Sequence, residues 1–389
     1  MTFLTALSSG CSAPLAALAI AILLVTGTAA AEAAGSSGQS PRATPQDAPA
    51  LERRLVDAVR RDPDSFEAHY VLASFYLHQG RLADAIRHLE RARAIDPTHY
   101  ASGYDLALAL LQTGKLDAAR EQVEHMLRVK ETGELHNLLG NIDEQAGRLA
   151  GAAASYQRAA HMEATEAHLF DWGNNLLQLR AFEPATEVFT AAIARHPASA
   201  RLHVGLGIAH YSRGQYADAV RAFCQAADLA PADPRPYQFL GEMYGVAPEL
   251  AGEMVPRLAR FVTAQPDNAV AHFHYAMSLW KGQPSPSAPR DLQHVERLLR
   301  RAVALDASLS KAFLELGILL SEQQRYTEAI QELRHAVRLE PDLTQARYRL
   351  AQAYQRTGQP DLAAKELEIF ERLESGDPRA GIQAPGPDR

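Results

Sequence analysis

The sequence predicts an all-helical (all-α) fold built from repeated pairs of antiparallel helices. A common pattern of apolar and small residues recurs along the chain and is clearest at residues 72–97, 206–231 and 316–341. These segments read LASFYLHQGRLADAIRHLERARAIDP, LGIAHYSRGQYADAVRAFCQAADLAP and LGILLSEQQRYTEAIQELRHAVRLEP. In each, two helical stretches flank a tight turn. One such pair cannot bury its apolar face alone, so neighbouring pairs must stack into an array.

This pattern resembles the tetratricopeptide repeat. Repeats of that family span about 34 residues, with a small residue at position 8, Ala at 20 and 27, a large apolar residue at 24 and often Pro at 32. The resemblance implies a right-handed superhelical solenoid of about nine repeats, preceded by a half-repeat at residues 51–63. The nine copies are expected to begin at Phe66, Tyr100, Gly133, Glu166, Ala200, Pro234, Ala269, Ser310 and Thr344.

Two positions set the phase of the nine copies. Position 8 is Gly or Ala in every copy, and position 24 is apolar or aromatic in every copy. A small residue at position 8 lets the two helices of a pair approach closely, and the large residue at position 24 fills the remaining volume. An ordinary bundle in an alanine-rich chain would not keep nine copies in phase. Glycines near the end of the first helix favour the left-handed backbone that stops a helix; they are Gly80, Gly114, Gly147, Gly214 and Gly358.

The first 31 residues are predicted to be a targeting segment rather than part of the repeat fold. Residues 1–31 contain no Lys, Arg, His, Asp or Glu, and residues 13–25 form the apolar run APLAALAIAILLV before a stretch of small residues. This arrangement resembles a secretory signal peptide, with cleavage after Ala31 or Ala33. Because no basic residue precedes the apolar run, retention as an N-terminal membrane anchor is the alternative. The expected location is secreted, periplasmic or at the cell envelope, with membrane contact only if the segment is retained.

The rest of the chain divides by composition. Residues 32–50 are small, polar and proline-containing and are interpreted as a flexible linker, residues 51–377 as the solenoid, and residues 378–389 as a disordered tail. Two copies are irregular. The sixth contains Pro248 and Pro256, and the seventh carries extra residues at 281–290. Both changes fall between first and second helices, where they are either tolerated drift or a local kink or contact loop.

Composition and motifs exclude several classes of function. The formal net charge of -7 provides no basic surface for nucleic acid. The chain contains no HExxH, phosphate-binding glycine loop, GxSxG or CxxC pattern, so no catalytic residue, cofactor or metal is predicted. His272 and His274 lie two residues apart and point in different directions on a helix, so they cannot share a metal. Cys224, among apolar neighbours, is interpreted as a small buried residue rather than a reactive thiol.

The resemblance also implies a binding surface. In this family, positions 2, 5, 9 and 12 of the first helices line a concave groove, and here that surface is rich in aromatic and amide side chains, which suit an extended polypeptide. The alternative for any one aromatic residue is a place in the core. The Lys and Arg of a carboxylate clamp are absent from the third and fourth copies, so no such clamp is predicted. The predicted groove residues are Tyr70, Tyr104, Asn137, Asn141, Phe170, Asn174, Tyr211, Phe273, Trp280 and Tyr348.

These observations favour a non-catalytic scaffold that binds proteins or peptides outside the cytoplasm or at the envelope. The alternative is a membrane-anchored assembly factor that organises an envelope complex. An enzyme is the third hypothesis, and it has little support because repeats fill the chain from about residue 51 to residue 376. The sequence names neither the partner nor the oligomeric state, because the exposed faces of a solenoid vary while its packing positions hold the fold.

Overall fold

The computed structural model describes residues 48–282 and 291–375, and within these residues the regular structure is entirely helical. The chain forms two compact units, which divide after Gly214 and are described separately. Unit 1 contains α2 (Ala48–Arg61), α3 (Phe66–His78), α4 (Leu82–Ile95), α5 (Tyr100–Gln112), α6 (Leu116–Val129), α7 (Gly133–Gln145), α8 (Leu149–Met162), α9 (Glu166–Gln178), α10 (Phe182–Arg195) and α11 (Ala200–Ser212).

Unit 2 continues the same alternation of helices with one irregular region. It contains α12 (Tyr216–Leu229), α13 (Pro234–Glu242), the 3-10 turns η1 (Met243–Gly245) and η2 (Pro248–Leu250), α14 (Ala251–Ala264), α15 (Ala269–Trp280), α16 (Leu292–Leu305), α17 (Ser310–Glu322), α18 (Tyr326–Leu339), α19 (Thr344–Arg356) and α20 (Pro360–Glu374).

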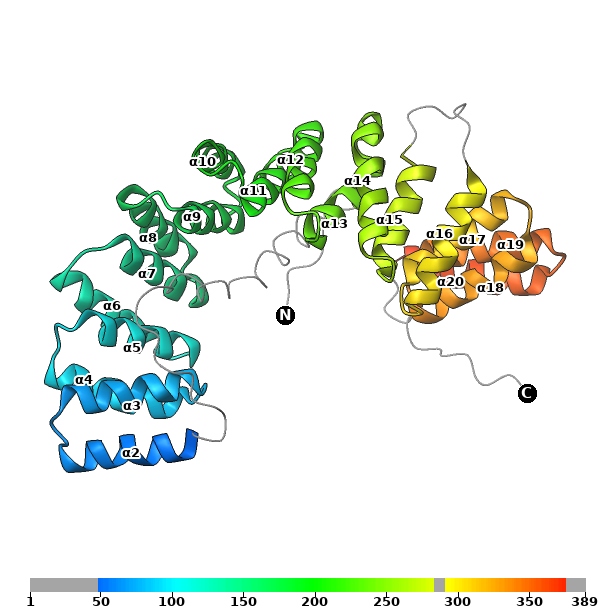
Figure 1. Ribbon diagram of the computed structural model, residues 1–389. Helices are drawn as coiled ribbons and strands as arrows, with labels where there is room; N and C mark the ends of the chain where they lie inside the picture. Colours follow the sequence, from blue (N-terminus) through cyan, green and yellow to red (C-terminus); the bar gives the residue numbers. More distant parts are fainter. Residues whose placement is uncertain (1–47, 283–290, 376–389) are drawn as a thin grey trace. The chain divides into compact units, whose positions relative to one another are not determined.

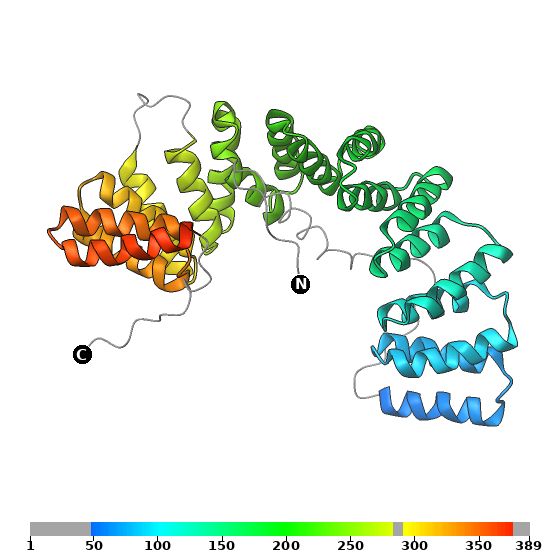
Figure 2. The same cartoon turned by 180° about the vertical axis from the view of Figure 1, so that it is seen from behind.

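The helices pack as consecutive antiparallel pairs. In unit 1 the pairs α3–α4, α5–α6, α7–α8 and α9–α10 lie side by side in chain order (Figure 1), and the reverse view shows the same order (Figure 2). The odd-numbered helices from α3 to α19 begin at the nine predicted residues, from Phe66 to Thr344. The all-helical repeat fold and its register are therefore confirmed.

Side-chain caps explain where most first helices begin. Seven of the nine follow a residue whose side chain accepts a hydrogen bond from the first-turn backbone, which satisfies an otherwise unpaired N–H group. The capping residues are Ser65, His99, Thr132, Thr165, Ser199, Asp233 and Asn268. The caps fix each entry point while the apolar stripe fixes the rotation of the helix.

In the third and fourth copies the core of the helix pair depends on the close contact predicted between positions 8 and 24. A Cβ atom added to Gly140 would lie 2.5 Å from Cε1 of Tyr156, and one added to Gly173 would lie 2.6 Å from Cζ of Phe189. Both distances are too short for a carbon–carbon contact, so these helix axes can approach only because the side chain is missing. The small and large residues therefore form one packing unit, as the sequence predicts.

Five turns use glycine in the left-handed backbone region, with φ between 70° and 75°, as predicted for Gly80, Gly114, Gly147, Gly214 and Gly358. Two other copies adopt the same turn without glycine, because Arg180 has φ 58° and Gln324 has φ 62°. Both side chains are exposed. A side chain with a Cβ atom is strained in this region, so these two positions store local strain.

We expect Arg180→Gly to stabilise unit 1 by about 1 kcal/mol, because relief of left-handed strain exceeds the extra chain entropy of glycine. Gly147→Ala, at the same turn position of the preceding copy, should destabilise unit 1 by a similar amount. Hydrogen exchange of the amides in α7 to α10 measures both effects. A loss of protection in Arg180→Gly would show that the turn is not strained.

The sixth copy departs from the pattern around Pro248, as predicted, but Pro256 does not lie between the first and second helices of the copy. Helix α13 ends at Glu242, earlier in its copy than the other first helices, and is followed by η1 and η2. Pro248 begins η2, and Pro256 lies inside α14. The irregular segment is thus a local break of the first helix. Of the insertion predicted at residues 281–290 of the seventh copy, residues 283–290 lie outside the described residues.

The first described helix covers the end of the array in unit 1. Helix α2 packs on α3 through Leu55, Val56 and Val59, and Tyr76 Oη donates a hydrogen bond to Glu52 at 3.2 Å. This is the half-repeat predicted at residues 51–63. The predicted targeting segment at 1–31, residues 32–47 of the predicted linker and the tail from 378 lie outside the described residues. Residues 48–50, predicted as linker, instead form the start of α2. Among the helices that are described, none has the length and apolarity to cross a bilayer.

Candidate functional site

The first helices of unit 1 form a polar face that runs from one repeat to the next. Hydrogen bonds about one repeat apart connect these helices: Tyr70 Oη donates to Asp105 Oδ2 at 3.1 Å, and Asn137 Nδ2 donates to Asp171 Oδ2 at 3.0 Å. We call this surface the first-helix face. It consists of the half-buried side chains of Tyr70, Tyr104, Asp105, Asn137, Asn141, Glu144, Asp171 and Asn174 on α3, α5, α7 and α9.

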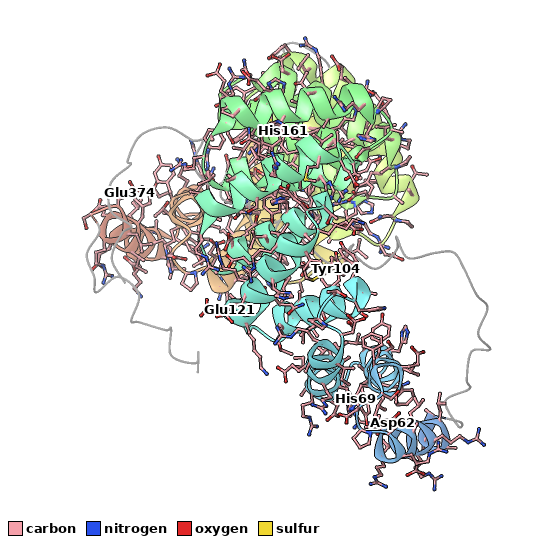
Figure 3. All side chains as sticks on the ribbon, turned by 90° about the vertical axis from the view of Figure 1, so that its left-hand side faces the viewer. Asp62, His69, Tyr104, Glu121, His161 and Glu374 are labelled. Atoms are coloured by element: carbon pink, nitrogen blue, oxygen red, sulfur yellow. The ribbon has the colours of Figure 1, made fainter. Side chains whose placement is uncertain are left out.

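The second helices form a separate surface. Figure 3 shows Tyr104 of α5 and Glu121 of α6 on opposite sides of their helix pair. Ion pairs are common at the starts of the second helices: Arg81, just before α4, pairs with Asp84, and Arg148, just before α8, pairs with Asp143 of α7. The first-helix face instead uses hydrogen bonds between uncharged donors and carboxylates. The two surfaces therefore differ in their electrostatic character.

Aromatic rings cluster at the start of the first-helix face. The ring of Tyr70 stacks on Phe66 with 5.7 Å between centroids and meets His99 edge-on at 5.3 Å. Tyr104 stacks on Tyr100 at 6.0 Å. Burial raises the pKa of Tyr104 to about 12, and burial together with the Asp105 carboxylate raises that of Tyr70 to about 12. Both phenols are therefore neutral at physiological pH and act as hydrogen-bonding aromatic surfaces.

Amides occupy the middle of the face. The Oδ1 atom of Asn141 accepts a hydrogen bond from Tyr156 Oη at 2.8 Å, which fixes the orientation of its amide. Asn137 is held by Asp171, while Asn174 is half-buried and forms no side-chain hydrogen bond within the described residues. The structure therefore brings Tyr70, Tyr104 and the three predicted asparagines onto one face. Their role in binding remains a prediction.

Four predicted groove residues are core residues instead, and this corrects the sequence interpretation. Phe170, Tyr211, Phe273 and Trp280 are only 7%, 6%, 5% and 2% exposed. Phe273 and Trp280 pack in one apolar cluster with Leu314 and Ile318 of the next first helix. Phe170 is covered by the guanidinium of Arg201, whose Cζ lies 4.6 Å from the ring centroid. Neighbouring first helices cover Phe170, Phe273 and Trp280, so these side chains fill volume rather than line a groove.

Tyr348 is the one predicted residue of unit 2 that is well exposed. Its side chain is 40% exposed on α19, and its ring lies 5.4 Å from that of Phe370 on α20. The first-helix positions of α15 and α17 before it are filled by buried apolar residues. Tyr348 is therefore not part of the first-helix face, and we assign it no role beyond packing against Phe370.

The sequence interpretation missed the carboxylates of the face. Asp105 and Asp171 occupy position 6 of their copies, next to the groove positions that the family resemblance names, and Glu144 occupies position 12. Burial raises the pKa of both Asp105 and Asp171, although hydrogen bonds from Tyr70 and Asn137 oppose that effect. A count of charges on the first helices alone would have revealed these residues, since α3, α5, α7 and α9 contain acidic residues but no Lys or Arg.

Other candidates for chemistry have structural explanations. Cys224 is 2% exposed, with its Sγ atom 3.9 Å from the carbonyl oxygen of Glu253, and burial raises the pKa of its thiol to about 11. The prediction of a small buried residue is confirmed. His272 and His274 are both buried, and no group of three potential metal ligands occurs in the part of the chain that the structure describes.

Known proteins share the repeat pattern. Family models described as tetratricopeptide repeats match residues 50–100, 76–142, 170–234 and 345–373, and a model described as a TPR repeat matches residues 319–358. The chain is also 23% identical over 167 residues to human "Protein O-mannosyl-transferase TMTC1". That similarity covers 41% of this chain but only 19% of the human protein, so it concerns about a fifth of the relative's length.

Similarity to a solved structure also shows the repeat fold. The C-terminal part of a TPR repeat-containing protein from Cytophaga hutchinsonii is similar with a TM-score of 0.51 at 18% identity, covering 62% of this chain and 97% of that one. YrrB, described as a TPR protein with an unusual peptide-binding site, is similar with a TM-score of 0.40 at 18% identity, covering 48% of this chain and 96% of that one. The matching family models together span more than half of the sequence. The chain belongs to the tetratricopeptide repeat family.

Proposed function

We propose that this chain is a non-catalytic scaffold that binds an extended polypeptide segment on the first-helix face of unit 1. The supporting observation is the ladder of side chains that recurs from α3 to α9, in which phenols and amides of one repeat contact carboxylates of a neighbouring repeat. An extended peptide presents N–H and C=O groups at regular spacing. A surface of amides, phenols and carboxylates repeated along four helices can pair with such a backbone over several residues.

The two units support this assignment to different degrees. In unit 1 the residues of the face are half-buried, so each keeps part of its side chain accessible. In unit 2 the corresponding positions of α15 and α17 are closed by Phe273, Met277, Trp280, Leu314 and Ile318. Binding energy in protein interfaces concentrates on a few residues, often tyrosine, which a partner can reach only if they are accessible in the free chain. Unit 1 therefore offers the better surface for a partner.

A selection experiment tests this function without assuming a partner. The full chain is immobilised and random 12-residue peptides are selected on it by display. We expect an enriched set whose binding weakens at least about tenfold when Tyr104→Ala and Asn174→Ala are combined, because both changes remove contact surface from the face. Affinity is measured by fluorescence anisotropy with a labelled enriched peptide.

Tyr326→Ala is the matched control. This half-buried tyrosine lies at the start of the second helix α18 in unit 2, away from the first-helix face. Its replacement should leave the affinity of the enriched peptide within about twofold of the unchanged chain. If no peptide is enriched, or if Tyr326→Ala weakens binding as much as the face variant does, the proposed function is wrong.

We further propose that the chain works outside the cytoplasm or at the envelope, directed there by residues 1–31. The proposal rests on the apolar run at 13–25 and the small residues that follow it. N-terminal sequencing of the protein recovered from cells should find a new terminus after Ala31 or Ala33. A retained Met1 in a membrane fraction would support the anchored alternative, and a retained Met1 in the cytoplasm would overturn both.

A further inference from the structure

Four of the first helices of unit 1 carry carboxylates but no Lys or Arg. Helices α3, α5, α7 and α9 contain seven carboxylates and no Lys or Arg. Two of the seven are neutralised: Asp143 pairs with Arg120 and Arg148, and Glu166 pairs with Arg201. The other five form no ion pair within the described residues; we call them the unpaired carboxylates, and they are Glu67, Asp105, Glu134, Glu144 and Asp171.

Neutral donors hold most of these groups in place. Tyr100 Oη donates to Glu134 Oε2 at 3.1 Å, and Gln178 Nε2 donates to Glu144 Oε1 at 2.8 Å. Asp105 and Asp171 accept from Tyr70 and Asn137, as described above. These bonds orient the carboxylates but leave their negative charge uncompensated. The nearby charged or titratable groups are His78 and His99 for Asp105, and Arg201, His168 and Glu144 for Asp171.

A second, independent observation comes from the amides beside these carboxylates. Asn175 is fully buried, and its Nδ2 atom donates to Glu144 Oε2 at 3.3 Å, so its Oδ1 atom must be the free acceptor end. That Oδ1 atom has no hydrogen-bond donor, and neither does the Oδ1 atom of Asn137, whose Nδ2 atom is bound to Asp171. Buried acceptors without donors are unfavourable. A ligand whose N–H groups reach these two Oδ1 atoms would supply the missing donors.

Two arginines of this chain show how a carboxylate and an aromatic ring together hold a cation. The guanidinium of Arg201 lies over the ring of Phe170 while it pairs with Glu166. The guanidinium of Arg81 lies 4.3 Å from the ring centroid of Tyr76 while it pairs with Glu52. A carboxylate beside an aromatic ring therefore binds arginine twice within unit 1. Tyr70 beside Asp105 offers the same two groups without an arginine.

Unit 2 provides an internal contrast. Its first helices α13, α15, α17 and α19 contain five Lys and Arg residues and three carboxylates. Among the first helices, the acidic surplus is thus confined to α3, α5, α7 and α9, the helices that form the first-helix face; α11, also in unit 1, carries Arg201 and no carboxylate. A ligand that depends on this surplus should contact unit 1 and not the first helices of unit 2.

We propose that the first-helix face selects an extended segment of a partner protein that carries several Lys or Arg side chains. The proposal rests on the function proposed above and specifies the chemistry of the partner. The unpaired carboxylates on α3, α5, α7 and α9 would each accept N–H groups from a basic side chain, while the tyrosines would contact its apolar stem or guanidinium plane. Charge complementarity identifies the occupant, because an acidic segment would meet only repulsion on these helices.

The first readout is the composition of the peptides enriched by display on the full chain. We expect their content of Lys plus Arg to be at least twice that of the starting library, and their content of Asp plus Glu to be lower than that of the library. Enrichment of neutral, apolar or acidic peptides would overturn the proposed basic partner and leave the scaffold function standing. The absence of any enrichment would overturn both.

The second readout tests which carboxylates of the chain contact the peptide. Asp105→Asn and Asp171→Asn combined remove two negative charges without changing side-chain size. The affinity for an enriched basic peptide should fall at least tenfold. Glu121→Gln and Glu187→Gln combined remove the same charge from exposed positions on α6 and α10, and should change affinity less than twofold. Equal weakening by the two pairs would mean that only the overall charge matters, which contradicts binding at this face.

Discussion

Gly241→Ala should destabilise unit 2 by about 3 kcal/mol, because the added methyl group has no space. A Cβ atom at this position would lie 2.0 Å from Cγ, 2.3 Å from Nδ1 and 2.4 Å from Cβ of His274. Rotation of the imidazole ring cannot relieve this contact, since the Cβ atom of His274 is fixed by its own backbone. The helices α13 and α15 must therefore move apart.

Gly252→Ala is the matched control for this prediction. Gly252 also lies in a helix of unit 2, but nothing approaches within 4 Å of a Cβ atom added there. This change should leave the free energy of unfolding unchanged or slightly increased, because alanine favours helix more than glycine does. Combining Gly241→Ala with His274→Ala should cost less than the sum of the single changes, by at least about 1 kcal/mol.

Tryptophan fluorescence can measure unit 2 by itself. The chain has two tryptophans, Trp172 in unit 1 and Trp280 in unit 2. In a Trp172→Phe background, urea unfolding followed at Trp280 reports the helix that carries His274. If Gly241→Ala and Gly252→Ala shift the unfolding midpoint equally, the close approach of α13 and α15 is not what holds this region together.

A fall in pH from 7 to 4 should destabilise unit 2 through His274 by about 3 kcal/mol. This histidine is 6% exposed, and burial lowers its pKa to about 4, helped by the positive charge of Lys311. As the pH falls below the ordinary histidine value of about 6.5, the unfolded chain takes up a proton that the folded chain does not. The free energy of unfolding therefore decreases down to about pH 4 and loses nothing further from this group below that pH.

The variant His274→Asn isolates this contribution. Asparagine keeps a planar polar group near Gly241 but does not titrate in this range. Urea unfolding at Trp280 is measured at several pH values in the chain with and without His274→Asn. The variant is expected to have a smaller pH dependence between 6.5 and 4, whatever its stability at pH 7. An identical pH dependence in both chains would show that His274 is not buried in the neutral form.

The repeat register could be predicted because it depends on short-range patterns that every copy carries. The contacts between positions 8 and 24 of the third and fourth copies, and capping residues such as Ser65 and Thr165, act within one helix pair or its entry turn. Packing of the helices also determines the turn at Arg180. The backbone there is left-handed although the sequence has no glycine. These local rules agree with one another, so the nine starting residues follow from the sequence.

The candidate site was less predictable because exposure depends on neighbouring repeats. Tyr70 and Phe273 occupy the same position in their copies, but Tyr70 is half-buried on the first-helix face and Phe273 is packed against α17. The sequence predicts that Gly241, at position 8, lets the two helices of its own pair approach closely. Its critical neighbour is instead His274 of the next copy. Neither difference is encoded at the position itself. By contrast, the excess of carboxylates over Lys and Arg on α3, α5, α7 and α9 follows from the sequence once the charges are counted helix by helix.

Photo-crosslinking with an enriched peptide tests the central claim most directly. A photoreactive residue is placed at successive positions of the peptide, and the crosslinked sites on the full chain are mapped by mass spectrometry. The proposed binding mode predicts sites on α3, α5, α7 and α9, moving along these helices in order as the reactive residue moves along the peptide. Sites that concentrate on α4, α6, α8 and α10, or in unit 2, would contradict binding at the first-helix face.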